Sequence, residues 1–520
     1  MKPTSKQVVQ GAIFLTIAGF VSKVLSAIYR IPLQNLAGDI GFYVYQQVYP
    51  FIGTVMILSL YGFPLAVSSL VAETKQTGQK ITWRQFIIPL YLVLLSINGI
   101  IFLFIFLSAP LIAMLSGEPT FTYMYRTVSI LFLFVPTVAL LRGTFQGIGE
   151  MAQTAYSQII EQIVRVSIII GAAYLVFIGQ LHVNKIGLAG IIASIAGFVF
   201  ISLLLLYIFM KRKIVEREKA LNTPIQWKYF FSICLTVGLI ASLNQLILIF
   251  IQFVDVITLV PNLIEFGLNM DEAREWKGII DRGQPLIQFG VVIGSSFALA
   301  LVPAMKSNQH KQTSLQSAQD ALSLSFYLAS GATVGLICIL PEANLLLFMD
   351  DQGTFSLQIL GWSILLSSVA ITGSTILLSE RQFQQIIFGI FVMIIIKYVL
   401  NEILIPLYSI SGSAIATVIS LSVFLIMIMI RLKSVHFIRT INFKAFLIAA
   451  LGMVIYLFAF RMMIYPIFEF SRIGLLCYVL FTVISGALIY VILLIRNNAF
   501  STSQLQNLPL SSFLQKFQRK

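Results

Sequence analysis

Four polar side chains that can bind charged groups share one face of an otherwise apolar predicted helix. They are Gln158, Glu161, Gln162 and Arg165, spaced i, i+3, i+4 and i+7, which is one stripe of an α-helix. A guanidinium suits phosphate or carboxylate, because its planar fork donates two hydrogen bonds and stays charged. One interpretation is that Glu161 holds Arg165 beside a cavity, with the glutamines orienting or gating. Another is that the two charges form an ion pair that only orients helix packing.

Further ionisable groups interrupt other apolar segments. A charged side chain at bilayer depth costs about 2.5–3.5 kcal/mol, so it normally faces a partner or a wet cavity. The cations predicted to line such a cavity and bind an anion are Lys23, Arg30, Arg142, Arg165 and Arg282. Asp281 and Gln284 join the residues with a gating or orienting role, and Asp281 is a candidate to lock one state by pairing between the two lobes. For Lys23 and Arg30 the alternative is snorkelling to the membrane surface, and for Arg142 it is a place at the interface.

The composition defines the class of protein. The 520 residues are 58% hydrophobic and 10% charged, with a mean hydropathy of +0.94. Apolar runs of about 20 residues match the hydrocarbon thickness of a bilayer, so we predict an all-α polytopic membrane protein and exclude a soluble globule. The three cysteines and three histidines are scattered, which predicts neither a disulfide framework nor a metal site.

We predict about fourteen membrane spans from these apolar runs. Their limits are 8–31, 44–72, 86–115, 122–147, 155–180, 187–210, 228–260, 280–305, 317–341, 355–379, 384–407, 410–432, 441–466 and 472–496. With both termini in the cytoplasm, most Lys and Arg residues fall in cytoplasmic segments, as the positive-inside rule requires. The net charge of +14 is then explained by topology and by attraction to anionic lipids, without nucleic acid.

The basic loop 211–226 predicts a boundary between two six-helix lobes. We expect an N-terminal lobe at 1–220, a C-terminal lobe at 221–436, two extra helices at 437–497 and a cytoplasmic tail at 498–520. The lobes are weakly alike: Glu150 precedes Arg165 as Glu380 precedes Lys397, and a Gly/Ala-rich helix follows each cation. Such a parallel repeat is typical of alternating-access transporters.

No phosphate-binding loop of the nucleotide type occurs in the sequence, and no segment is long enough for an ATPase domain. We therefore expect no cofactor and no covalent chemistry, with any energy coming from the membrane potential or an ion gradient. An enzyme, such as a polymerase of lipid-linked sugars, would need catalytic groups on an exterior loop. The longest such loop, 261–280 with Glu265, Asp271, Glu272 and Glu275, is more simply a solvated acidic loop.

Five stretches together resemble the multidrug/oligosaccharidyl-lipid/polysaccharide exporter superfamily. They are "VSKVLSAIYRIP" (21–32), "YGFPLAVSSLVAE" (61–73), "LRGTFQGIGEMAQTAYSQIIEQIVR" (141–165), "DRGQPLIQFGVVIGSSFALALVPAMK" (281–306) and "NEILIPLYSISGSAIAT" (401–417). The branch that they resemble is that of lipid II flippases (MurJ-type) and SpoVB-like or YtgP-like exporters of polysaccharide biosynthesis. The order and spacing fit along nearly the whole chain.

The resemblance implies a flippase of the bacterial cytoplasmic membrane, whose cargo is a polyprenyl-diphosphate-linked oligosaccharide for peptidoglycan or another cell-wall polysaccharide. It also implies a V-shaped fold with a central cationic cavity, in which the family's basic residues map onto Lys23, Arg30 and Arg282. We expect a monomer, with cell-wall synthesis proteins as candidate partners. The alternative within the superfamily is a cation-coupled multidrug antiporter, which would need acidic residues in the cavity.

Some relatives hold a sodium ion between helices 7, 11 and 12. The corresponding ion-coupling candidates are Asp255, Lys397, Asn401 and Thr417. Because Lys397 is itself a cation, we expect its ammonium to take the place of the metal ion.

Overall fold

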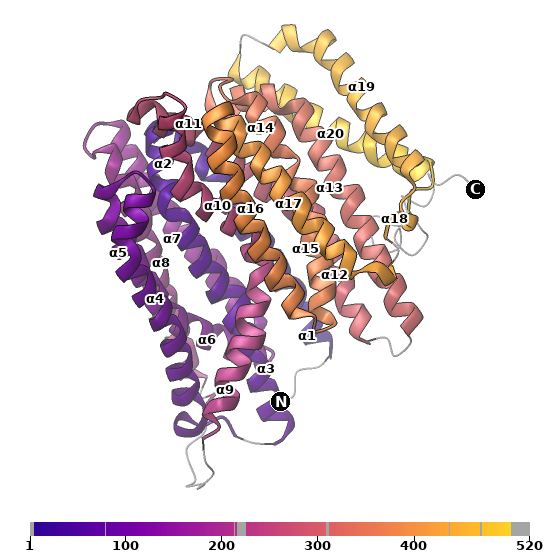
Figure 1. The fold of residues 1–520 in the computed structure, drawn as a ribbon. Coiled ribbons are helices and arrows are strands. Elements are labelled where there is room, and N and C mark those ends of the chain that lie inside the picture. The colour runs from indigo at the N-terminus through magenta and orange to yellow at the C-terminus, as the bar shows by residue number, and fades with distance from the viewer. Residues whose placement is uncertain are drawn as a thin grey trace. The chain divides into compact units, whose positions relative to one another are not determined.

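The computed structural model describes residues 5–78, 80–212, 214–215, 225–307, 311–435, 437–468 and 471–500. Most of the predicted basic loop 211–226, and the predicted tail 498–520 from residue 501 onward, lie outside these ranges. Within them the chain forms helices joined by short connections, and no β-strand occurs (Figure 1). The prediction of an all-α fold is confirmed.

Twelve described segments are long and apolar enough to cross a membrane. A helix is the natural form for such a segment, because it satisfies every backbone hydrogen bond internally where no water is available. The first segment, Ile17–Gln76, is 60 residues long and contains three helices in succession. These segments make the chain a multi-pass membrane protein, and the count of about fourteen spans stays a prediction.

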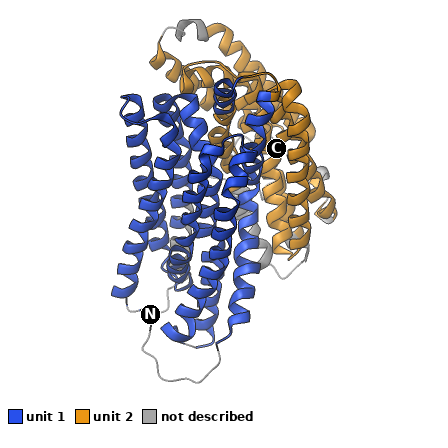
Figure 2. Cartoon of the chain, turned by 60° about the vertical axis from the view of Figure 1, so that its left-hand side comes forward, with its two compact units in different colours: residues 1–264, 269–278 blue, residues 265–268, 279–520 orange. Residues whose placement is uncertain are grey.

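The chain packs as two compact units (Figure 2). Unit 1 comprises residues 1–264 and 269–278, and unit 2 comprises residues 265–268 and 279–520. These units reflect packing within the structure, whereas the predicted lobes 1–220 and 221–436 rest on the basic loop 211–226 and on a weak sequence repeat. The lobe boundaries therefore stay a prediction.

Most of unit 1 is built from long helices with short 3₁₀ or π turns, labelled η, between them. Its elements are α1 (Ser5–Ile28), α2 (Arg30–Ile57), η1 (Leu58–Gly62), α3 (Phe63–Gln76), η2 (Trp83–Ile87), α4 (Ile88–Leu115), η3 (Pro119–Phe121), α5 (Thr122–Ser129), η4 (Ile130–Leu133), α6 (Val135–Gly147), α7 (Met151–Phe177), η5 (Val183–Lys185), α8 (Ile186–Lys211), α9 (Trp227–Ile233), η6 (Cys234–Leu239), α10 (Ile240–Glu265) and most of α11 (Met270–Asp281).

Unit 2 continues from the end of α11. Its elements are α12 (Gly283–Ser307), α13 (Lys311–Phe348), α14 (Thr354–Gly361), α15 (Ser363–Ser379), α16 (Phe383–Tyr408), α17 (Ile410–Arg431), η7 (Lys433–Val435), α18 (Phe437–Thr440), α19 (Phe443–Phe468) and α20 (Arg472–Arg496). The last two helices pack on each other and on α13. Their contact residues, such as Tyr327, Met453 and Tyr490, form one apolar core.

A single glycine breaks the helical path that begins with α1. The backbone amide of Tyr29 still donates to the carbonyl of Leu25 at 3.2 Å, and that of Leu33 to the carbonyl of Tyr29 at 3.1 Å. The helical path is interrupted within α2 at Gly38, whose φ of 69° is readily adopted only by glycine. Because helical hydrogen bonds continue across Tyr29, Lys23 and Arg30 lie on one nearly continuous helical stretch before Gly38. The predicted span 8–31 falls within this stretch.

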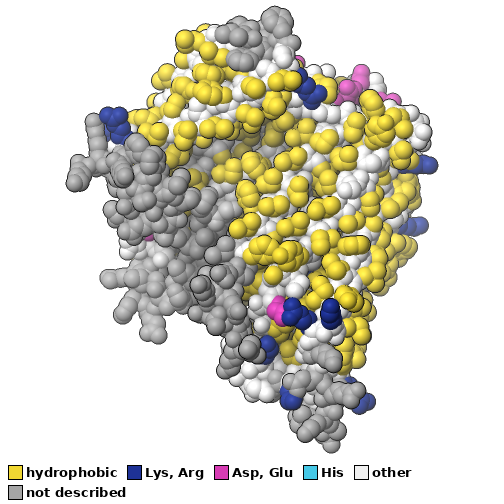
Figure 3. Space-filling view, turned by 180° about the vertical axis from the view of Figure 1, so that it is seen from behind, with side chains coloured by type: hydrophobic (Ala, Val, Ile, Leu, Met, Phe, Trp, Pro, Cys, Tyr) yellow, Lys and Arg dark blue, Asp and Glu magenta, His cyan; other side chains and the backbone are white. Residues whose placement is uncertain are grey.

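Large apolar side chains cover much of the outside of the helices. Figure 3 shows one face on which hydrophobic side chains dominate and charged ones gather toward the ends. On α4, for example, Phe104 and Leu107 are exposed, with 69% and 72% of their surface accessible. Apolar surfaces of this extent are stable facing lipid and not water.

Candidate functional site

The first buried charge cluster joins three segments of unit 1. Arg142 of α6 is fully buried, and its Nη2 donates to Oε2 of Glu161 on α7 at 2.8 Å. Its Nε donates to the hydroxyl of Ser157 at 2.9 Å, and its Nη1 to the carbonyl of Ser59 in η1 at 3.3 Å. Each guanidinium nitrogen therefore has an acceptor, and the charge is balanced by a carboxylate, as a buried ion requires.

The predicted pairing of Glu161 with Arg165 is wrong, because the carboxylate forms its ion pair with Arg142. The alternative of an interfacial place for Arg142 stays a prediction, although its side chain is fully buried in the protein. Arg165 is buried and donates from Nη2 to Oε1 of Gln162 at 2.6 Å, and from Nη1 to the sulfur of Met56. Within the described part of the chain its Nε has no hydrogen-bond partner, and neither has Oε1 of the buried Gln158.

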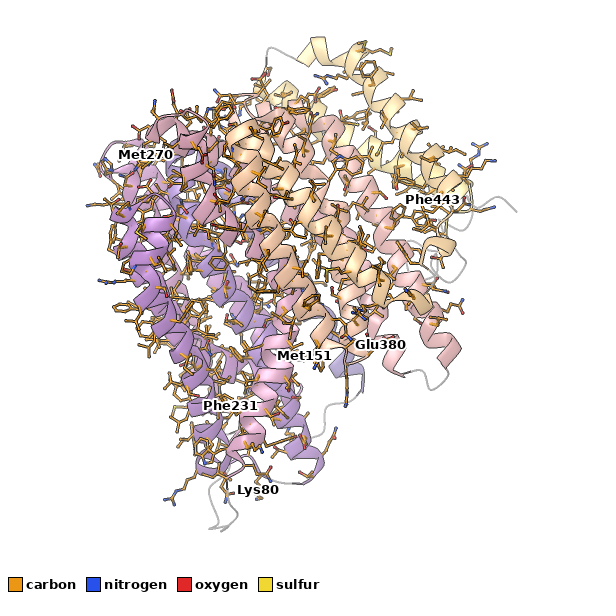
Figure 4. The ribbon with its side chains drawn as sticks, viewed as in Figure 1. Lys80, Met151, Phe231, Met270, Glu380 and Phe443 are labelled. Carbon is orange, nitrogen blue, oxygen red and sulfur yellow. The ribbon has the colours of Figure 1, made fainter. Side chains whose placement is uncertain are left out.

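Helix α7 begins at Met151, which is labelled in Figure 4. All four residues of its predicted polar stripe are buried. The sequence periodicity therefore predicted the buried face of α7. It did not predict the partners, because those come from α2 and α6.

The two basic residues before Gly38 lie against aromatic rings. The guanidinium carbon of Arg30 lies 3.8 Å from the ring centroid of Tyr49, and Arg30 is fully buried, so it does not snorkel to the surface. The hydroxyls of Tyr29 and Tyr45 hydrogen-bond to each other beside it. Lys23 is half-buried, with its ammonium 5.6 Å from the ring centroid of Tyr61. Aromatic faces stabilise cations without neutralising their charge.

A second arginine–carboxylate pair lies in unit 2. Arg282, between α11 and α12, is fully buried and donates from Nη1 and Nη2 to the two carboxylate oxygens of Asp350, at 2.6 and 2.9 Å. Its guanidinium also lies 5.2 Å from the ring centroid of Phe348. Asp350 was not predicted, although its place in the acidic "MDDQG" turn after α13 is a signal for a cation partner. Asp281 and Gln284 are buried next to this pair in sequence.

The predicted ion-coupling residues divide between the two units. In unit 2 the ammonium of Lys397 on α16 is fully buried and donates to Oδ1 of Asn401, and to the carbonyl and hydroxyl oxygens of Ser413, each at 3.0 Å. Thr417 of α17 donates to the same carbonyl at 3.0 Å. Asp255 is buried on α10 in unit 1. Ser413, which supplies two of these acceptors, was not predicted.

One more buried carboxylate, in unit 1, was not predicted. Glu118, in the turn after α4, accepts from Nε and Nη2 of Arg274 on α11 at 2.6 and 2.9 Å, and from the hydroxyl of Tyr43 at 3.1 Å. The hydrogen bonds from Arg274 to Glu118 are the main reason that the pKa of Arg274 lies above its ordinary value. The ammonium of Lys277 lies 5.5 Å from the Tyr43 ring. The predicted acidic loop 261–280 is thus partly helical, and Arg274 of this helix binds the turn after α4 within unit 1.

The predicted cations differ in whether they form an ion pair with a described carboxylate. Arg142 and Arg282 are neutralised by carboxylates, and Lys397 donates hydrogen bonds to oxygens of Asn401 and Ser413. Lys23 and Arg165 form no ion pair with any described carboxylate. Lys23 and Arg165 therefore stay candidates for binding an anion. No described cluster of His, Cys, Asp and Glu could hold a metal ion.

Comparison with known proteins finds one protein family and several membrane proteins that are similar to this chain. A family model described as "Polysaccharide biosynthesis protein" matches residues 8–309. The chain is 32% identical to the uncharacterized membrane protein YabM of Bacillus subtilis over 521 residues, which is 98% of this chain and 96% of YabM. It is 29% identical to the lipid II flippase MurJ of the same organism over 443 residues, covering 79% of this chain and 80% of MurJ.

Solved structures show the same fold. The lipid II flippase MurJ in an inward closed conformation matches with a TM-score of 0.65 at 14% identity, covering 94% of this chain and 99% of that one. An inward-facing multidrug resistance MATE family transporter of the MOP superfamily matches with a TM-score of 0.54 at 14% identity, covering 82% and 99%. The resemblance that the sequence predicted is confirmed.

Proposed function

Because the chain belongs to the polysaccharide biosynthesis protein family, we propose that it moves a polyprenyl-diphosphate-linked cell-wall or polysaccharide precursor across the cytoplasmic membrane. The similarity to the lipid II flippase MurJ supports a lipid II-like cargo. Movement would follow alternating access, with both termini in the cytoplasm and no covalent step. Lipid-linked oligosaccharide and anionic membrane lipids would be its partners.

The observation that carries this proposal is the state of Arg165. Its guanidinium is buried on a membrane-spanning helix, yet its described acceptors are the neutral amide of Gln162 and a sulfur. An uncompensated charge in such a place is costly, and an arriving diphosphate would remove that cost by supplying both charge and acceptors. Nε, which has no described partner, leaves a donor for a phosphate oxygen.

Other predicted residues take supporting roles in this proposal. Lys23 would add positive charge, since the aromatic ring beside it does not neutralise it. Arg30, which is buried against Tyr49, would contribute beside it. Arg142 and Arg282 would reach the cargo only after exchanging a carboxylate for a phosphate. Asp350, one-third exposed, is easier to displace than Glu161, which is almost fully buried.

The alternative of a drug/cation antiporter is supported by the fold shared with MATE transporters. Binding an organic cation requires a carboxylate that is available to it. The carboxylate of α7, Glu161, is already bound by Arg142, which favours an anionic cargo for this region.

A leaflet-protection assay tests the proposal. The purified chain is placed in vesicles with fluorescent lipid-linked sugar, and the initial rate of protection is measured. For Arg165→Met we expect a loss of roughly 10- to 100-fold, because a hydrogen bond to a charged group is worth about 1.5–3 kcal/mol. Arg165→Lys keeps the charge, so its rate of protection should lie between those of the unmodified chain and of Arg165→Met.

The matched control is Arg126→Gln. Arg126 is an exposed arginine on α5 that stacks over Phe106 at 5.4 Å, so its loss changes the net charge equally without touching the site. Normal transport by Arg165→Met, or an equal loss in Arg126→Gln, would defeat the assignment of Arg165 to cargo binding.

A further inference from the structure

Two charged residues of α16 lie on different sides of that helix. Lys397 is fully buried, whereas Glu402 is exposed. Five residues turn a helix by about 140° beyond a full turn, which explains the separation. The exposed neighbours of Glu402 are apolar or aromatic, among them Tyr398, Val399 and Ile403. A carboxylate therefore stands in the apolar outer surface of a membrane-spanning helix.

This position differs from that of other carboxylates in the described candidate spans. Glu161 and Glu342 are buried, and each forms an ion pair with an arginine. Three carboxylates are exposed, and two of these, Glu73 and Glu265, lie in the last turn of their spans. Glu402 lies six residues before the end of α16, and no hydrogen bond or ion pair joins it to another described residue.

The depth of Glu402 makes its solvation a problem. It lies about 10 Å from the midpoint of α16 along the axis, at 1.5 Å per residue, and half the hydrocarbon thickness is about 15 Å. Its own backbone adds a second acceptor: Pro406, four residues later, has no N–H to donate to the carbonyl of Glu402. A carboxylate and a carbonyl therefore both require a donor at this depth.

We propose that the outer face of α16, defined by Phe391, Ile395, Tyr398, Glu402 and Ile403, packs against a transmembrane helix of another membrane protein that carries Lys or Arg at the depth of Glu402. A basic side chain would neutralise the carboxylate and donate to both acceptors, which lipid tails cannot do. α16 leaves this face open because its own packing in the chain is mainly with α17.

A second copy of this chain fits the face less well. In a two-fold symmetric pair the same patch meets itself, so two Glu402 carboxylates would approach each other at the same depth. A lipid amine could reach the carboxylate from the membrane surface, but it would leave the apolar part of the face unpartnered. Both occupants are distinguished by the experiment below.

The experiment measures association between the full-length purified chain and synthetic transmembrane peptides in phosphatidylcholine vesicles. Energy transfer is recorded between a donor on the chain and an acceptor on Leu/Ala-rich peptides carrying one Lys about 10 Å from their centre, or Leu or Glu there instead. We expect the Lys peptide to associate roughly three- to thirty-fold more strongly than the Leu peptide, the range given by one interhelical polar contact.

Two variants make the result specific. Glu402→Gln should reduce the association of the Lys peptide with the chain to that of the Leu peptide. Glu402→Lys should reverse the preference, so that the Glu peptide associates most strongly. Circular dichroism of each variant checks that the helices are intact, and the charge reversal gives a gain of binding that misfolding cannot mimic. Equal association of all peptides, or no effect of Glu402→Gln, would overturn the proposal. So would Glu402-dependent self-association of the chain, or loss of the Lys preference when phosphatidylethanolamine is added.

Discussion

α7 and α16 each contain one acidic and one basic residue, and the two helices use them in opposite ways. In α7, Glu161 and Arg165 are four residues apart and both are buried. In α16, Lys397 and Glu402 are five residues apart, one buried and one exposed. A shift of one residue in spacing therefore decides whether the second charge faces the protein or the membrane.

The way each charge is balanced also differs. Glu161 is balanced by Arg142 of a neighbouring helix, which leaves Arg165 with neutral acceptors. The ammonium of Lys397 has three N–H donors, and three oxygens of Asn401 and Ser413 accept hydrogen bonds from it. The described acceptors of Arg165 on α7 are thus neutral and include Met56 of α2, whereas Lys397 of α16 donates to Ser413 of the neighbouring helix α17.

The largest effect on stability should follow Glu161→Gln. It leaves Arg142 charged and buried without its carboxylate, and removing one partner of a buried pair costs about 3–5 kcal/mol. The free energy of unfolding, measured by reversible unfolding in mixed micelles, should fall by that amount. Combining Glu161→Leu with Arg142→Met should recover most of the loss, because no buried charge remains. If the double variant is no more stable than the single one, the pair is not what stabilises this region.

A smaller loss is expected for Lys397→Met. The substitution removes three buried hydrogen bonds to Asn401 and Ser413, at a total cost of about 1–3 kcal/mol. The same unfolding measurement should detect this change, while the transport rate per folded molecule stays near that of the unmodified chain. A variant that folds stably but no longer transports would show that Lys397 does more than join α16 to α17.

The smallest change should follow Glu402→Gln in the isolated chain. Glu402 is exposed and bonds to no described residue, so its replacement should alter the unfolding free energy by no more than about 0.5 kcal/mol. The chemical change equals that of Glu161→Gln, which makes the two variants a matched pair. Similar losses in both would mean that the described contacts do not account for the difference between α7 and α16.

The sequence predicted the class of fold and the buried faces of the helices well, because both depend on local composition and periodicity. The stripe of Gln158, Glu161, Gln162 and Arg165 is buried as expected. The break at Gly38 was not predicted to the residue, since glycine occurs 33 times in the chain and few of these positions need a left-handed backbone.

Partners of charged groups were harder to predict, because they come from other helices. The i, i+4 rule suggested Arg165 for Glu161, but that rule describes neighbours on the surface of one helix. In this helix bundle, Glu161 instead forms its ion pair with Arg142 of the neighbouring helix α6, at 2.8 Å. Asp350 was missed for Arg282 in the same way: the two residues are 68 positions apart, and only the packing of α12 on α13 brings them together.

The cage around Lys397 has a consequence for how this part of the chain responds to its surroundings. A ligand that is covalently attached is present at an effective local concentration which dilution of the bulk solution does not change. The oxygens of Asn401 and Ser413 are thus occupied by a cation that the chain carries with it. The hydrogen bonds by which Lys397 joins α16 to α17 therefore need no ion from the surrounding solution.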